Sequence, residues 1–208
     1  MLSVQKHFSL LEGCTFALII GLLYTLHNYA FGIGDHLEQL PIVLRFIDNN
    51  YLINDFFTNV STSFGPRYYF ANIIATLSRV SSLPAVYFLL TILSNCAIAI
   101  ITFLFARDLF NKSSFAGIFA VLVVMTVNSF RLGYVSRIHL NYLVPASLAT
   151  PFVLLSIMVG FREKPIASSF IAGFAAIIHP LLGLETGAIV LLTLLISKFN
   201  PKYIKRVY

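Results

Sequence analysis

Long apolar runs, separated by short charged or proline-bearing segments, dominate the hydrophobic pattern of this chain. Clear runs cover 10–29 and 83–105, and shorter or interrupted runs cover 115–127, 140–161 and 166–199. A helix of about 20 apolar residues crosses the hydrocarbon core of a bilayer. The pattern therefore predicts an all-α protein, a polytopic bundle of about six transmembrane helices.

Prolines and length refine three of these predicted spans. Pro84 falls in the first turn of the second span, where a missing backbone N–H costs nothing. Pro145 and Pro151 lie within the fourth span, and we expect them to kink it. The last run, 166–199, is longer than one helix needs, so we expect a hairpin of two spans with its turn at 179–185.

The longest polar stretch, 31–67, follows the first span and is net acidic. Within it, 41–47 and 51–57 mix apolar and charged residues, a pattern typical of short amphipathic helices in the membrane interface. A plug packed over the helix bundle would show the same pattern. The apolar segment 68–77 is too short to cross a bilayer upright. We expect it to form a helix at the membrane surface or against the bundle, or a short tilted span.

Composition supports a membrane protein. Of the 208 residues, 58% are hydrophobic and 11% are charged, against roughly 25% charged in soluble proteins. This composition argues against a soluble globular enzyme, a disordered tail and a disulfide scaffold. The formal charge of +6 comes from basic residues scattered at the ends of apolar runs, so membrane lipids are expected partners and nucleic acid is not. We expect one transmembrane domain over 1–208.

The distribution of lysine and arginine predicts the topology. With a cytoplasmic N-terminus, nine of these residues fall inside and five outside, the bias that the positive-inside rule requires. Both termini are then expected to be cytoplasmic, and the chain to be a multi-pass membrane protein. The acidic loop 31–67, the loop near 131–139 and the 179–185 turn share the outer face.

The acidic loop opens with the first candidate site residues. Asp35 and Glu38 are three residues apart, so one helical turn points both carboxylates the same way. Two such carboxylates suit a general base or a metal ion that holds a phosphate. A solvated helix start, with Asp35 as the N-cap, is the structural alternative.

Two further polar groups are predicted on the outer face. Arg137 is suited to phosphate or carboxylate, and His139 is suited to proton transfer. Singly, both are equally explained as lipid headgroup contacts. His179 and Glu185 are ionisable residues in an apolar hairpin, which indicates function or a buried pair. A histidine that ends a helix before Pro180 is the structural alternative.

Three segments carry a resemblance to a known class of membrane protein. GDHLEQLPIVLRFIDNNYLINDFF, FGPRYYF and IIHPLLGLE, together with a first span and an acidic outer loop, resemble a group of bacterial membrane proteins with the architecture of GT-C glycosyltransferases. The resemblance covers most of the chain. Its specific parts are the loop that contains GDH and the HPLLG turn.

This resemblance implies transfer of a sugar from a polyprenyl phosphate at the outer face of the membrane. Asp35 matches the acidic residue that serves as base or divalent metal ligand, with Glu38 as a second carboxylate. The resemblance also implies a bacterial inner membrane as the location. By resemblance, Arg67, Arg137 and His139 are candidates for binding the lipid phosphate, and His36, His179 and Glu185 complete the set of substrate-binding candidates. GT-C enzymes have more spans and often a soluble C-terminal domain, so a truncated member, with a continuation or a partner chain, is expected.

A non-catalytic membrane protein, such as a transporter or an assembly subunit, is the alternative function. A transporter would place its ionisable residues at the membrane midplane on broken helices. A transferase would bring the outer groups into one pocket, with Asp35 within roughly 10 to 15 Å of the others, the breadth of a small-molecule cleft.

Overall fold

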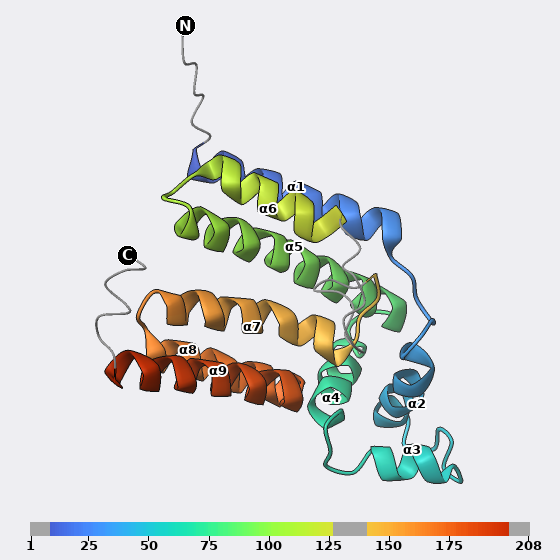
Figure 1. The fold of residues 1–208 in the computed structure, drawn as a ribbon. Helices are drawn as coiled ribbons and strands as arrows, with labels where there is room; N and C mark the ends of the chain where they lie inside the picture. Colours follow the sequence, from blue (N-terminus) through green and yellow to red (C-terminus); the bar gives the residue numbers. More distant parts are fainter. Residues whose placement is uncertain (1–8, 127–140, 200–208) are drawn as a thin grey trace, which may run out of the picture.

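The computed structural model describes residues 9–126 and 141–199, and 78% of these residues are helical (Figure 1). No strand occurs in these described ranges, so the predicted all-α class is confirmed. The helices are α1 (Leu10–Asn28), α2 (His36–Ile47), α3 (Phe56–Ser61), α4 (Tyr68–Leu77), α5 (Leu83–Leu109), α6 (Ser114–Thr126), α7 (Pro145–Phe161), α8 (Pro165–Ile178) and α9 (Pro180–Phe199).

Two of these helices, α1 and α5, are long and apolar enough to cross a membrane. The apolar helices α4, α6, α7 and α8 are shorter, as is the segment Pro180–Ile196 of α9. The apolar runs of the sequence therefore do fold as helices, while the arrangement of six spans stays a prediction.

Two groups of three helices form the bundle. Helices α1, α5 and α6 pack together, α7, α8 and α9 pack together, and α5 contacts α7 between them (Figure 1). The ring of Phe103 fills the first group, because a Cβ on Gly13 or Gly117 would lie only 2.0 or 2.5 Å from its ring atoms. In the second group, a Cβ on Gly183 would lie 2.2 Å from the backbone of Ala176. Glycine thus lets these helices approach closely.

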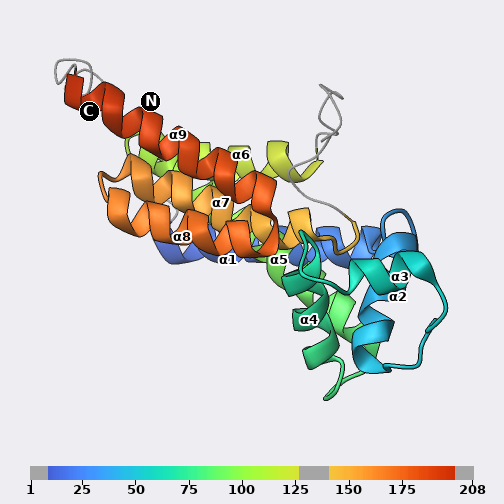
Figure 2. The ribbon, with the colours of Figure 1, turned by 90° about the horizontal axis from the view of Figure 1, so that it is seen from below.

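The segment 31–80 forms a cap at one end of the bundle. Helix α2 packs on α4, and both lie across that end together with α3 (Figure 2). The cap is held by a cluster of buried side chains that includes Ile42 on α2, Phe70 and Ile74 on α4, and Tyr87 on α5. Helix α2 is amphipathic, as predicted for 41–47, but it begins earlier, at His36.

Several predicted boundaries agree with the structure. Helix α1 covers Leu10–Asn28, α4 covers Tyr68–Leu77 and α5 begins at Leu83 with Pro84 in its first turn. The predicted hairpin is also present, because α8 and α9 pack side by side around a break at His179. Apolar runs therefore located these helices correctly.

Three local predictions were wrong. The segment 51–57 is mostly turns, and α3 begins only at Phe56. Pro145 is the first residue of α7, where its missing N–H is unused, so it starts the helix rather than kinking it. The chain reverses at His179 alone, and Glu185 lies within α9 rather than in the turn.

Candidate functional site

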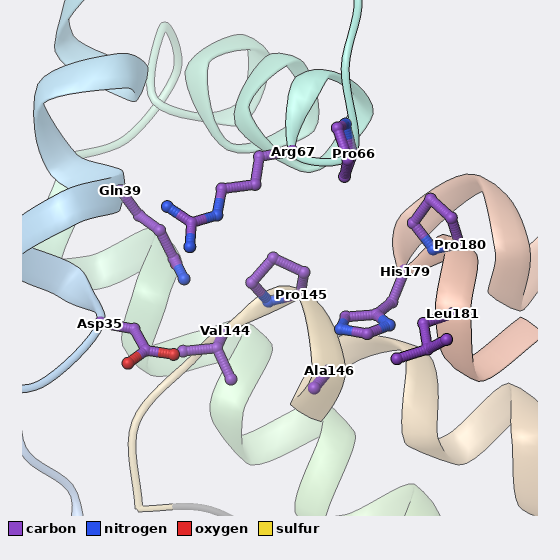
Figure 3. Close-up of a pocket in the computed structure, with 10 residues that line it drawn as sticks. All are labelled: Asp35, Gln39, Pro66, Arg67, Val144, Pro145, Ala146, His179, Pro180 and Leu181. Atoms are coloured by element: carbon purple, nitrogen blue, oxygen red, sulfur yellow. The ribbon is translucent and has the colours of Figure 1, made fainter. Parts of the chain in front are cut away.

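A pocket of about 280 Å³ opens where the cap meets the bundle (Figure 3). Its wall on the cap side comes from α2 and from the residues before α4, and its wall on the bundle side comes from the starts of α7 and α9. The lining residues are Asp35, Gln39, Pro66, Arg67, Val144, Pro145, Ala146, His179, Pro180 and Leu181.

Four helices point their N-terminal ends at this pocket. Asp35, Arg67, Val144 and His179 directly precede α2, α4, α7 and α9, and all four line the cavity. The first turn of a helix has N–H groups without intrahelical acceptors and carries a partial positive charge. In α2 the first N–H groups already donate to carbonyl oxygens of residues 33–35, so that end contributes mainly its partial positive charge. Four helix ends around one cavity favour an anionic group such as phosphate.

Asp35 lies at the N-cap position of α2 with its carboxylate available. Gly34, which has a positive φ of 55°, turns the chain just before it. The side chain of Asp35 makes no capping hydrogen bond, and within the part of the chain that the structure describes it has no ion-pair partner. The alternative role of Asp35 as a side-chain cap is therefore not what the structure shows.

Arg67 and Glu38 form an ion pair at the edge of the pocket. A guanidinium nitrogen of Arg67 donates to a carboxylate oxygen of Glu38 over 2.9 Å, and the two side chains are 38% and 58% exposed. Arg67 lines the pocket and Glu38 does not. The two carboxylates of the acidic loop therefore do not share one site, although their spacing suggested that they would.

His179 lies on the opposite wall from α2 and is half-buried. Its Nδ1 accepts a hydrogen bond from the backbone N–H of Leu182 at 3.3 Å, so the proton of the neutral ring sits on Nε2. Burial lowers the pKa of His179, and the charge of Glu185 opposes this only weakly. His179 thus offers a neutral N–H donor, while Glu185 is exposed on α9 outside the pocket.

His36 has a structural role in place of the predicted contact with substrate. Its ring is fully buried, and Nδ1 accepts from the N–H of Gly32 at 3.0 Å. Nε2–H donates to the carbonyl oxygen of Leu143 at 2.7 Å, so both ring nitrogens are used. Burial also lowers the pKa of His36. The ring ties the start of the cap to the segment before α7, and so positions two walls of the pocket.

Gln39 is a pocket residue that the sequence analysis did not identify. It lies one helical turn after Asp35, is only 3% exposed and lines the cavity. Its Oε1 is buried without a hydrogen-bond partner among the described residues. A buried acceptor left in this state costs of order 1–3 kcal/mol. The only sequence signal was its place, four residues after Asp35 on the same helix face.

The pocket does not fit a divalent metal ion. No group of three or more histidine, cysteine, aspartate or glutamate side chains gathers anywhere in residues 9–126 and 141–199 as metal ligands would. Among the described residues, Asp35 is the one carboxylate that lines this cavity, and Arg67 brings a positive charge to the same lining. Magnesium and calcium prefer about six oxygen ligands. We therefore assign no step to a metal ion.

The structure thus brings together Asp35, Arg67 and His179 from the predicted set, as a shared pocket required. Arg137 and His139 lie outside the described residues. Comparisons of the chain with models of protein families, with curated proteins and with solved structures found no match. The chemistry of the site therefore rests on the pocket itself.

Proposed function

We propose that this chain is an integral membrane protein of a bacterial inner membrane that binds a polyprenyl-phosphate-linked sugar and transfers the sugar, as the GT-C class does. The outer surface of the bundle supports the membrane setting. Large apolar side chains are exposed on several of its helices, including Leu11 (77%), Phe115 (77%), Ile166 (87%) and Ile196 (63%). Extended apolar surface of this kind is rare on soluble monomers and suits contact with lipid.

Topology is consistent with this setting. The pocket lies at one end of the bundle, whereas α1 begins and α9 ends at the other (Figure 1). Six spans with both termini cytoplasmic would put the pocket at the outer face, where a lipid-linked donor presents its headgroup.

The observation that carries the proposal is the shared pocket of Asp35, Arg67 and His179 beside four helix N-termini. Arginine and helix N-termini are the usual partners of phosphate. A volume of about 280 Å³ is at the low end for small-molecule sites, so it suits a headgroup without its lipid chain. The exposed apolar residues Leu181 and Leu184, at the start of α9, offer a path for that chain.

Asp35 acts as the general base in this proposal. Its carboxylate takes the proton of the acceptor hydroxyl, and the acceptor oxygen forms a bond to the anomeric carbon of the sugar. The bond from that carbon to the phosphate oxygen breaks, and its electron pair stays on the leaving polyprenyl phosphate. Arg67, His179 and the helix ends stabilise the negative charge that the phosphate gains.

Asp35→Asn is the test, with Asp48→Asn as the matched control. Asp48 follows the last residue of α2, just as Asp35 precedes the first. The carboxylate of Asp48 accepts a local hydrogen bond from the backbone N–H of Asn50. In lipid nanodiscs, the full chain should bind labelled decaprenyl-phosphate mannose and transfer the sugar to acceptors in a membrane extract. Asp35→Asn should keep binding and lose transfer by about 100-fold or more, the scale of a general base. Absence of binding, or equal transfer by both variants, would refute the proposal.

The non-catalytic alternative, a transporter, would require a different placement of His179 and Glu185. A transporter would need them at the midplane of a pathway. His179 instead lies at the end of the bundle between α8 and α9, and Glu185 is exposed on the outside of α9. This arrangement favours binding of a headgroup over transport.

A further inference from the structure

The buried amide of Gln39 is the polar group of the pocket that the proposed transfer reaction leaves unused. Its side chain is almost fully buried, yet Figure 3 shows the nitrogen of its amide directed into the cavity beside Asp35. Its Oε1 has no hydrogen-bond partner within the described residues. Buried polar groups in proteins are nearly always paired, and a half-turn of the amide would bring Oε1 to the cavity, where a ligand can supply its partner.

An amide has a distinctive chemistry as a ligand contact. It donates through Nε2 and accepts through Oε1, and a half-turn about its last bond exchanges the two. A sugar hydroxyl both donates and accepts, so it can pair with either arrangement. Asp35, one helical turn away on α2, adds a second acceptor on the same wall.

The other polar groups of the pocket have the opposite preference. Arg67 and the Nε2–H of His179 only donate, and the starts of α7 and α9 add the partial positive charge of their helix ends. These groups suit the oxygens of a phosphate. The groups that suit hydroxyls therefore lie on α2, and the groups that suit an anion lie just before α4 and at the starts of α7 and α9.

We propose that Gln39 is a specificity residue that recognises a hydroxyl group of the sugar. The headgroup then binds with its sugar against α2 and its phosphate toward Arg67 and the N-terminal ends of α7 and α9. This proposal rests on the proposed function, and it adds the orientation of the substrate and a residue that distinguishes a sugar-bearing lipid from the bare lipid phosphate.

Two lipids that differ only in the sugar test this role. Farnesyl phosphate and farnesyl-phosphate mannose are titrated against the full chain in nanodiscs by microscale thermophoresis. Wild-type protein should bind the mannose lipid about tenfold more tightly than the bare phosphate, the scale of one or two net hydrogen bonds. Gln39→Met, which is close in size and apolar, should bind both lipids equally by losing affinity for the mannose lipid alone.

Two further variants separate recognition from structure. Gln39→Asn keeps an amide and should retain part of the preference, which also covers the case in which Gln39→Met fails to fold. Asn72→Leu is the matched control, because the amide of Asn72 already donates to the carbonyl of Tyr68 within α4. It should leave the preference unchanged.

The outcomes distinguish this inference from the proposed function. If wild-type protein binds neither lipid, the proposed function fails and the role of Gln39 fails with it. If wild-type protein prefers the mannose lipid and Gln39→Met keeps that preference, the role of Gln39 is refuted while the function stands. If Gln39→Met weakened the binding of both lipids equally, Gln39 would have a purely structural role, and the inference would also be overturned.

Discussion

Aspartates at the two ends of the bundle have opposite surroundings. Asp108, near the end of α5, is 14% exposed and accepts hydrogen bonds from Lys112 and from Arg162, the latter at 2.8 Å. The Arg162 contact ties α5 to the end of α7. Asp35, at the pocket end, is exposed and has no such partner in the described part of the chain.

This difference separates charges that stabilise the fold from charges that are available to a ligand. The hydrogen-bonding capacity of Asp108 is used within the protein, so its contribution is to stability. Asp35, Gln39 and the Nε2–H of His179 keep unused capacity around one cavity. Active sites commonly keep such capacity, because a group that is already paired must give up that partner before it can bind anything else.

Substitution of His36 should have the largest effect on stability, because both of its ring nitrogens are hydrogen-bonded within the protein at the pocket end of the bundle. His36→Ala would remove a buried ring, two hydrogen bonds and contacts with Phe31, Tyr87 and Tyr142. We expect a loss of about 2–4 kcal/mol in the free energy of unfolding. Chemical unfolding in detergent micelles measures it, with the exposed His27→Ala as control. A loss below about 1 kcal/mol would contradict the structural role of His36.

The two aspartates should respond differently to the same change. Asp108→Asn removes the charge that Arg162 and Lys112 share, and we expect a loss of about 1–2 kcal/mol, reduced by the exposure of both cations. Asp35→Asn removes no partner and should change stability by less than about 0.5 kcal/mol. Unfolding of both variants under identical conditions checks this, and equal losses would remove the contrast between the two ends.

Lowering the pH should reduce the stability of the protein through His36 and His179, which lie at the pocket end of the bundle. Burial lowers the pKa of His36 and of His179 from the ordinary value of 6.5. The unfolded chain therefore binds protons first as the pH falls, so stability is complete above about pH 6.5 and is lost progressively below it. Thermal unfolding between pH 8 and pH 5 should show this decline, and His36→Asn should reduce its slope. A pH dependence unchanged by that substitution would assign the decline to other groups.

The smallest expected effect belongs to the Glu38–Arg67 pair. Both side chains are substantially exposed, and such pairs contribute about 0.2–1 kcal/mol. Glu38→Gln should therefore cost little stability. It should also tighten binding of farnesyl phosphate severalfold, because the carboxylate that competes for Arg67 is gone. Weaker binding by this variant would instead mean that Glu38 holds Arg67 in its binding position.

Local patterns predicted the helices well and the pocket only in part. Apolar runs are enough to locate α1, α4 and α5, because a helix that is apolar along its length needs no distant partner to be recognised. The residues of the pocket depend on contacts far apart in the sequence. His36 pairs with Leu143, 107 residues away, and Arg67 pairs with Glu38, 29 residues away. No spacing rule reports such contacts.

Topology explains the part of the site that was predicted. Asp35 and His179 were assigned to one face because odd and even connections of a helical bundle alternate between its ends, and the structure places both in one pocket. Gln39 was missed because a single glutamine in an apolar helix gives no signal until its neighbours are known. The separation of Glu38 from Asp35 was missed for the same reason, since Arg67 determines where Glu38 points.

Binding of a phosphate-bearing lipid to two arginine variants tests the central claim most directly. Arg67 precedes α4 and lines the pocket, whereas Arg79 follows the same helix and is exposed outside it. Titration of farnesyl phosphate in nanodiscs should show at least tenfold weaker binding for Arg67→Gln, the scale of one lost charged hydrogen bond. Arg79→Gln should bind like the wild-type protein. Equal affinities for the two variants would contradict a phosphate site at the junction of the cap and the bundle.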